Sequence, residues 1–160
     1  MPSVDAKTSA DIYIRQALEN DADSIAGLLE ELGYPGEISF ARDHIRRSRG
    51  PHSHSDIQVV ECNKAIVGFI AWYRMDVLPY PYAWLRITAL CVTASHRHKG
   101  LGHALEASAQ RAAVRQGCEF IELTSDILRT TAHRFYERLG YVEKRRRYMK
   151  RISMDQGKRR

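Results

Sequence analysis

Two glycines and a short basic run stand together near the middle of the chain, and their types and spacing suit the binding of an anion. Residues 97–99 read Arg-His-Lys, and Gly100 and Gly102 follow them. Alanines and leucines then recur every three or four residues as far as Ala113, which predicts a helix beginning near Gly100. The first N–H groups of a helix have no partner within it, and glycine lets an anion approach the main chain. The sequence therefore predicts a phosphate-binding turn at the start of a helix.

This glycine pattern differs from two common phosphate-binding motifs. A P-loop needs Lys and then Ser or Thr after its last glycine, whereas Gly102 is followed by His103 and Ala104. The dinucleotide-binding pattern needs a third glycine, and Leu105 stands at that position. What remains is R-x-x-G-x-G, beginning at Arg97, behind an apolar strand that ends L-x-V. A surface turn that happens to contain glycines and bases would give the same pattern.

A second pattern lies closer to the C-terminus. Residues 132–141 read AHRFYERLGY and fit A-x-x-[FLW]-Y-x-x-x-G-[FY], behind a strand-like run at residues 120–124. Together the two patterns resemble those of the GCN5-related N-acetyltransferase (GNAT) superfamily, over about residues 12–152. The resemblance implies a mixed α/β fold, the GNAT acyl-CoA N-acyltransferase fold. Its central splayed sheet would have six to seven strands, with helices on both faces.

The same resemblance implies an enzyme that moves an acetyl group from acetyl-CoA to a primary amine, by direct attack in a ternary complex and without a metal. The acceptor, a small molecule or a protein amino group, stays open. In the family, the arm of the cofactor pairs with the main chain of the strand before the glycine turn, and its phosphates bind the turn. The residues thereby implied in cofactor binding are Leu90, Cys91, Val92, Arg97, His98, Lys99, Gly100, Leu101, Gly102, His103, Ala104 and Arg129.

Tyr136 is the residue that the resemblance implies as general acid. A phenol is protonated at neutral pH and can donate a hydrogen bond to the departing thiolate, although an ordinary core tyrosine is the alternative. The general base stays open, because Thr88 stands where the family often has Glu. Glu122 on the neighbouring strand, His133 or a chain of waters are the candidates. Arg129 stands where the family often has Asn.

Alternating and periodic patterns predict the elements that position these residues. The predicted strands lie at about 12–15, 57–62, 65–73, 84–92 and 120–124, with a last pair at 141–142 and 147–152. The predicted helices lie at about 21–32, 39–49, 100–116 and 131–139. This order predicts a single domain over residues 12–152, between a disordered lead-in at 1–11 and a basic disordered tail at 153–160.

Charge is concentrated at one end of the 160-residue chain, whose formal net charge is +6. Residues 144–160 hold nine Lys or Arg and one Asp, whereas the rest of the chain holds 16 basic and 18 acidic residues. Such a tail can bind nucleic acid, but a solvated edge strand with a frayed end is the favoured interpretation. No apolar run reaches the roughly 20 residues that a membrane span needs. Three widely spaced cysteines predict buried thiols in a reducing cytoplasm.

Two other functions stay open. The missing strand glutamate would suit a non-catalytic acyl-CoA-binding domain, and the basic tail would suit a nucleic-acid-binding module. A homodimer is also left open. The histidine pairs His52 with His54 and His96 with His98 have no evident third ligand, so no metal site is predicted.

Overall fold

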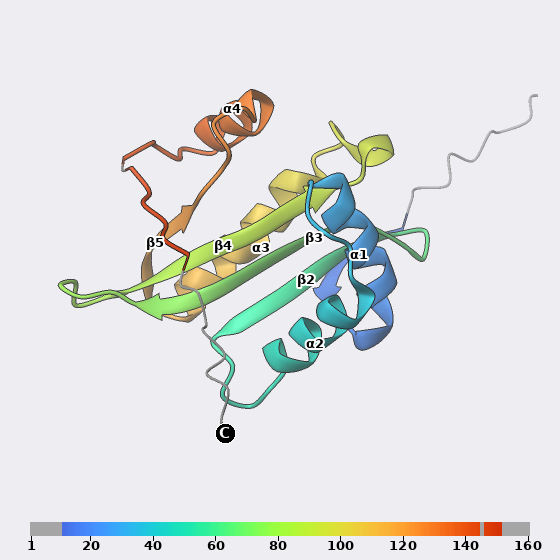
Figure 1. Cartoon of the computed structure of the whole chain (residues 1–160), viewed down its shortest axis with the longest axis horizontal. Coiled ribbons are helices and arrows are strands. Elements are labelled where there is room, and N and C mark those ends of the chain that lie inside the picture. The colour runs from blue at the N-terminus through green and yellow to red at the C-terminus, as the bar shows by residue number, and fades with distance from the viewer. Residues whose placement is uncertain (1–10, 145, 152–160) are drawn as a thin grey trace, which may run out of the picture. The chain divides into compact units, whose positions relative to one another are not determined.

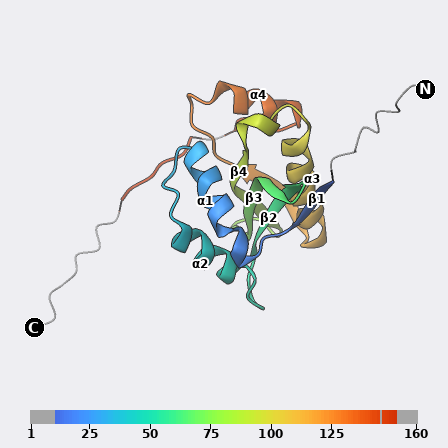
Figure 2. The same cartoon turned by 90° about the vertical axis from the view of Figure 1, so that its right-hand side faces the viewer.

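The computed structural model describes residues 11–144 and 146–151. Two compact units divide the chain, the first ending at Thr124 and the second beginning at Ser125. The first unit contains a sheet with helices on both faces (Figures 1 and 2). The second contains α4 (Thr130–Arg138). Apart from Asp11, the predicted lead-in and tail lie outside the described residues.

The sheet of the first unit has five strands in sequence order. They are β1 (Ile12–Gln16), β2 (Ser55–Cys62), β3 (Ala65–Asp76), β4 (Ala83–Val92) and β5 (Cys118–Leu123). Strands β1 to β4 pair with one another antiparallel, and β5 is parallel to β4. The helices are α1 (Ala22–Glu31), α2 (Ile38–Ser48) and α3 (Leu101–Arg115), and short 3₁₀ turns lie at Glu19–Asp21 and Ala94–His96. Helices α1 and α2 lie on one face of the sheet and α3 on the other (Figure 2).

Each face of the sheet buries its own apolar core. On the α3 side, Leu85 and Ile70 of the strands pack with Leu105 of the helix, and all three are fully buried. On the other side, Val59 packs with Ile45 of α2. Apolar residues on both faces of central strands are typical of a sheet covered by two helical layers. The mixed α/β class predicted from the sequence is confirmed.

The expected count of six to seven strands is wrong for the described residues, which form five. Residues 141–144 and 146–151 contain no strand, while residues 145 and 152 lie outside the described part. Tyr148 and Met149 are 86% and 77% exposed. Because adjacent residues of a strand point to opposite faces, these two could not share an apolar face, and the described basic residues on either side of them are exposed.

Gly33 ends α1, next to the predicted end of this helix at residue 32. Its φ of +95° is left-handed, which suits glycine. Its N–H donates to the Glu30 carbonyl and the Tyr34 N–H donates to the Leu29 carbonyl, both at 2.9 Å. These two bonds form a Schellman cap. The cap fixes Glu31 in the last turn of α1.

A nearly buried ion pair holds the entry to α1. Asp21 is 7% exposed, and Arg15 of β1 donates to both of its carboxylate oxygens, at 2.7 and 3.0 Å. The Leu18 N–H donates to the same carboxylate at 2.7 Å. Burial disfavours the charged carboxylate, but the hydrogen bonds from Arg15 and Leu18 outweigh it and hold the pKa of Asp21 below its ordinary value.

We expect Asp21→Asn to lower the free energy of unfolding at pH 7 by about 1–3 kcal/mol, because it removes hydrogen bonds to a charged, buried group. The folded-state pKa of Asp21 lies below the unfolded one, so its contribution is complete above the unfolded pKa and is lost as the pH falls through the folded pKa. Urea unfolding at several pH values should show the two proteins converging in acid. Asp23→Asn, with a side chain 74% exposed, is the control and should behave as wild type. A variant at Asp21 as stable as wild type at pH 7 would contradict this role.

Candidate functional site

The predicted phosphate-binding turn lies at the start of α3. Gly100 is the N-cap, with a φ of +80°, and His98 is also left-handed, with a φ of +61°. The first hydrogen bond of the helix runs from the Ala104 N–H to the Gly100 carbonyl, at 3.0 Å. The N–H groups of residues 101–103 therefore have no acceptor within the helix. A Cβ added at Gly100 would meet nothing within 4 Å, so the space beside the main chain is open to a ligand. The turn fits a phosphate group.

Arg97 directs part of its guanidinium inward, toward the strand that precedes the turn. Its Nε donates to the Val92 carbonyl at 2.9 Å, and its Nη2 lies 3.4 Å from the Glu31 carboxylate. Its side chain is 48% exposed. Arg97 thus fastens the turn to the end of β4, and its predicted contact with a phosphate stays a prediction.

One edge of β4 is open over its last five residues, since none of the described strands pairs with it there. The strand pairs with β3 as far as Val92, but it pairs with β5 only from Ala83 to Ile87. Thr88 has no partner in the register with β3, because Ala71 pairs with Ala89 and the next residue of β3 pairs with Ile87. The Thr88 hydroxyl donates to the Ala71 carbonyl at 3.2 Å. Such a bulge bends a strand, and the parting of β4 from β5 begins there. The main chain around Leu90 can therefore accept an extended ligand as an added strand.

An ion pair lies just before the point where the two strands part. Arg86 of β4 donates from Nη1 to the Glu122 carboxylate of β5 at 2.6 Å, and the two residues are in register. Leu85 and Ile87 belong to the core on the α3 side, so Arg86 points to the opposite face. The side chains of the pair are 22% and 31% exposed. Glu122, a predicted base candidate, is thus held by a cation.

The second unit contains the other predicted residues. The Tyr136 ring lies edge-on to Phe135 and Tyr141, with centroids 5.1 and 5.6 Å apart. The His133 Nε2 donates to the Asp126 carbonyl at 2.8 Å, because a carbonyl can only accept, and this leaves Nδ1 as the basic nitrogen. The exposed Arg129 immediately precedes α4. These neighbours hold the Tyr136 and His133 rings within their own unit.

The structure brings together the predicted residues of the first unit and adds two that sequence reasoning missed. Residues 97–100 form the turn, residues 101–104 begin α3, and residues 90–92 form the open strand end that precedes the turn. The additions are Arg86 and Glu31. A cation between two apolar strand residues could have drawn attention to Arg86, whereas Glu31 lies more than 60 positions from its partners.

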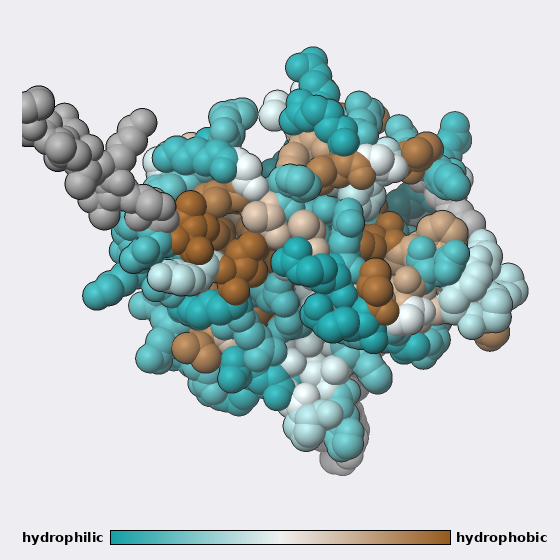
Figure 3. Space-filling model, turned by 180° about the vertical axis from the view of Figure 1, so that it is seen from behind, coloured by the Kyte–Doolittle hydropathy of each residue, from teal (hydrophilic) through white to brown (hydrophobic). Residues whose placement is uncertain are grey.

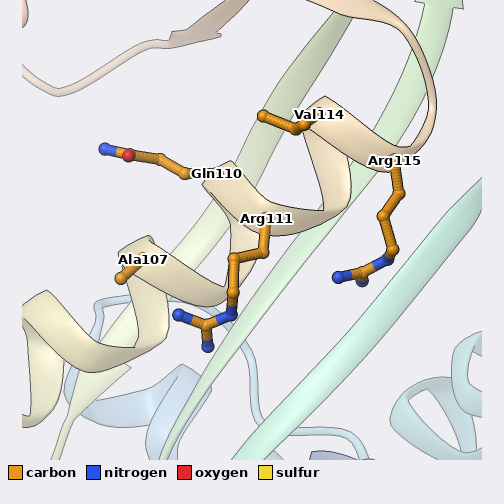
Figure 4. A pocket seen from close by; sticks show the side chains of 5 residues that line it. All are labelled: Ala107, Gln110, Arg111, Val114 and Arg115. Atoms are coloured by element: carbon orange, nitrogen blue, oxygen red, sulfur yellow. The ribbon is translucent and has the colours of Figure 1, made fainter.

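A shallow hollow on α3 does not belong to this site. Figure 4 shows its lining side chains, all from one helix: Ala107, Gln110, Arg111, Val114 and Arg115. Because a single helix lines it, it lacks the facing walls that enclose a ligand. Figure 3, which shows the α3 side, has apolar patches scattered among hydrophilic side chains.

Among the described residues, no group of three or more His, Cys, Asp or Glu side chains could hold a metal ion. None of the helices described is long and apolar enough to cross a membrane.

Residues 19–141 match the model of the acetyltransferase (GNAT) family. The chain belongs to this family. It is 31% identical over 140 residues to the aminoalkylphosphonate N-acetyltransferase of Salmonella typhimurium. The aligned region covers 86% of this chain and 89% of that protein. The resemblance inferred from the two motifs is confirmed.

Solved structures share the fold. An aminoglycoside N-acetyltransferase in complex with CoA superposes with a TM-score of 0.77 at 20% identity, over 91% of this chain and 97% of that one. A protein described as a transcriptional regulator from Bacillus halodurans gives a TM-score of 0.78 at 24% identity, over 89% of this chain and all of that one. The GNAT fold predicted from the sequence is therefore the observed one.

Proposed function

We propose that this GNAT protein is an acetyl-CoA-dependent N-acetyltransferase that acts on a primary amine by direct attack in a ternary complex. The observation that carries the proposal is the left-handed Gly100 at the start of α3, beside the β4 edge that is open beyond Ile87. The α3 N-terminus would hold the phosphates, and the main chain of residues 90–92 would pair with the pantetheine arm. The thioester would then lie toward Thr88, next to the Arg86–Glu122 pair.

The reaction needs one proton removed and one supplied. As the amine nitrogen attacks the thioester carbon, a C–N bond forms, the C–S bond breaks, and the electron pair of that bond leaves on sulfur. Tyr136 is proposed to donate to the departing sulfur, and Glu122, His133 or water to take the proton from nitrogen. His133 retains a basic Nδ1, whereas the Glu122 carboxylate already accepts from Arg86. A cytoplasmic location is part of the proposal, because three widely spaced cysteines suit a reducing compartment.

For the acceptor we propose a short primary amine that carries an acidic group. Arg86 supports this choice: its partly buried guanidinium lies on the face of the sheet opposite α3, just before the open edge of β4, and it pairs with Glu122 through Nη1. A guanidinium has five N–H donors, which suit a phosphonate or a carboxylate. The similarity to an aminoalkylphosphonate N-acetyltransferase supports the same class.

Acetyl transfer to a panel of amines, followed by release of free thiol, tests this function. The panel contains short aminoalkylphosphonates, amino carboxylates, uncharged alkylamines of matched length, aminoglycosides and peptide amines. We expect acidic short amines to be the best acceptors. Binding of acetyl-CoA without thiol release with any amine would favour the non-catalytic alternative.

Arg86→Gln should lower kcat/KM for the acidic acceptor by about 10–100-fold, because it removes a charge-assisted hydrogen bond. Turnover of the uncharged amine should change little. Arg86→Gln combined with Glu122→Gln separates the loss of the cation from the effect of an unpaired carboxylate. Arg74→Gln is the matched control, since Arg74 lies on β3 and pairs with Asp76 at 3.0 Å. Equal losses for both classes of acceptor would exclude Arg86 as the anion contact.

A further inference from the structure

The structure assigns Glu31 a positioning role. We propose that its carboxylate holds residues 92–97 in the conformation that binds acetyl-CoA before the cofactor arrives. The inference rests on the proposed function, since it takes the turn at Gly100 as the cofactor site. Glu31 lies on α1, and no residue of that helix was predicted from the sequence to take part in cofactor binding.

Three donors from the segment between β4 and the turn converge on this one carboxylate. The Thr93 hydroxyl donates to Oε1 at 2.6 Å, and the Ala94 N–H donates to Oε2 at 3.1 Å. The Arg97 Nη2 reaches Oε2 at 3.4 Å. A backbone donor, a hydroxyl and a guanidinium are thus gathered by a residue more than 60 positions earlier in the chain.

The same segment is also tied to the sheet. The Thr93 N–H donates to the Val67 carbonyl of β3 at 2.8 Å, and Arg97 donates from Nε to the Val92 carbonyl at 2.9 Å. Arg97 therefore links Glu31 on one side to the last residue of β4 on the other. Gly100, the N-cap of α3, follows three residues later, so the direction of the anion-binding helix end depends on this attachment.

The position of Glu31 on its own helix is unfavourable for helix stability. It occupies the last turn of α1, where the helix dipole disfavours negative charge, and that turn contains no basic residue. The donors that offset this cost come from residues 93–97 rather than from α1. A carboxylate next to a phosphate site would also repel the ligand, and Arg97 neutralises it there. The unfavourable position of Glu31 in α1 and its neutralisation by Arg97 are both explained if the carboxylate holds residues 93–97 in place.

A turn that already has its binding conformation in the free protein binds the cofactor more tightly. The entropy cost of ordering the turn then falls on folding and not on binding. His98 and Gly100 are both left-handed, a conformation that a free loop with histidine at this place would rarely adopt.

Glu31→Ala is the first test, with two measurements. In the ligand-free protein, amide hydrogen exchange at Ala94 should accelerate, because its N–H loses its acceptor. The Kd for CoA, measured by calorimetry, should rise about tenfold or more, since hydrogen bonds to a charged group are lost. The kcat at saturating acetyl-CoA should stay within about threefold of wild type, because Glu31 does not touch reacting atoms.

Two further variants separate positioning from general damage. Glu30→Ala removes the same charge from the same turn of α1 and should leave both the exchange at Ala94 and the Kd unchanged. Glu31→Gln keeps an acceptor oxygen for Thr93 or Ala94 and should recover part of the lost affinity. Thr93→Val should weaken CoA binding in the wild-type background and have less effect once Glu31 is Ala, because the two share one hydrogen bond.

The outcomes distinguish this inference from the proposed function. If the wild-type protein does not bind CoA, both are overturned. If it binds CoA and Glu31→Ala shows wild-type exchange at Ala94 or wild-type affinity, the positioning role alone is overturned. An equal loss of affinity in Glu30→Ala would also overturn it, because charge in the last turn of α1 would then explain the effect.

Discussion

Gly100→Glu should abolish the binding of acetyl-CoA. Gly100 has a φ of +80°, which disfavours any residue with a Cβ by about 1–2 kcal/mol, and it caps the end of α3 where the phosphates are proposed to bind. The variant places a carboxylate in the open space beside this main chain. Wild-type protein at 100 times the Kd should gain about 2.7 kcal/mol, which corresponds to a rise in Tm of about 5–10 °C. In Gly100→Glu that rise should vanish.

Gly117→Glu is the matched control at the other end of α3. Gly117 is also left-handed, with a φ of +65°, and a Cβ there would likewise meet nothing within 4 Å. Both variants therefore introduce the same strain and the same charge, and both should lower the Tm of the free protein. The Gly117 variant should keep the full shift with acetyl-CoA. A full Tm shift in Gly100→Glu, or loss of the shift in both variants, would contradict the binding of the phosphates at the start of α3.

The turn at Gly100 could be predicted because its causes are local. Glycine spacing, the preceding apolar strand and the periodicity of α3 all fall within about 30 consecutive residues. The same holds for the end of α1 at Gly33 and for the end of α4, where the Tyr141 N–H donates to the Tyr136 carbonyl at 3.1 Å. In each case the residue types determine the backbone conformation directly.

The contacts around the turn could not be predicted, because they join distant parts of the chain. Glu31 meets residues 93–97 only after α1 packs on the sheet, and Arg86 meets Glu122 only after β5 pairs with β4. The open edge of β4 depends on where that pairing stops and on the bulge at Thr88. The predicted last strand pair failed for the opposite reason. Among its described residues, Val142 and Tyr148 satisfy a local pattern but are 73% and 86% exposed, so they contribute no buried face.

Tyr136→Phe should lower kcat by about 10²–10⁴-fold if its hydroxyl donates to the departing sulfur, since general acid catalysis contributes on that scale. The affinity for acetyl-CoA should change little, because Tyr136 is not proposed to hold the phosphates or the arm. The ring contacts with Phe135 and Tyr141 survive the change, so the packing around the ring should be kept.

Tyr141→Phe is the control for Tyr136→Phe. It removes a hydroxyl from a neighbouring ring, whose centroid lies 5.6 Å from that of Tyr136, and it should leave kcat within about threefold of wild type. Equal losses in the two variants would point to a shared structural effect and not to an acid at Tyr136.

The pH dependence of kcat in Tyr136→Phe separates acid catalysis from amine deprotonation. An essential acid gives a fall in rate on the alkaline side, and an essential base gives one on the acid side. Tyr136→Phe should therefore lose the alkaline fall and keep the acid one. A loss below about tenfold would mean that the thiolate leaves unaided or that deprotonation of the amine limits the rate. Wild-type turnover with an unchanged profile would make Tyr136 a packing residue, and the proton for sulfur would then have to come from another group or from water.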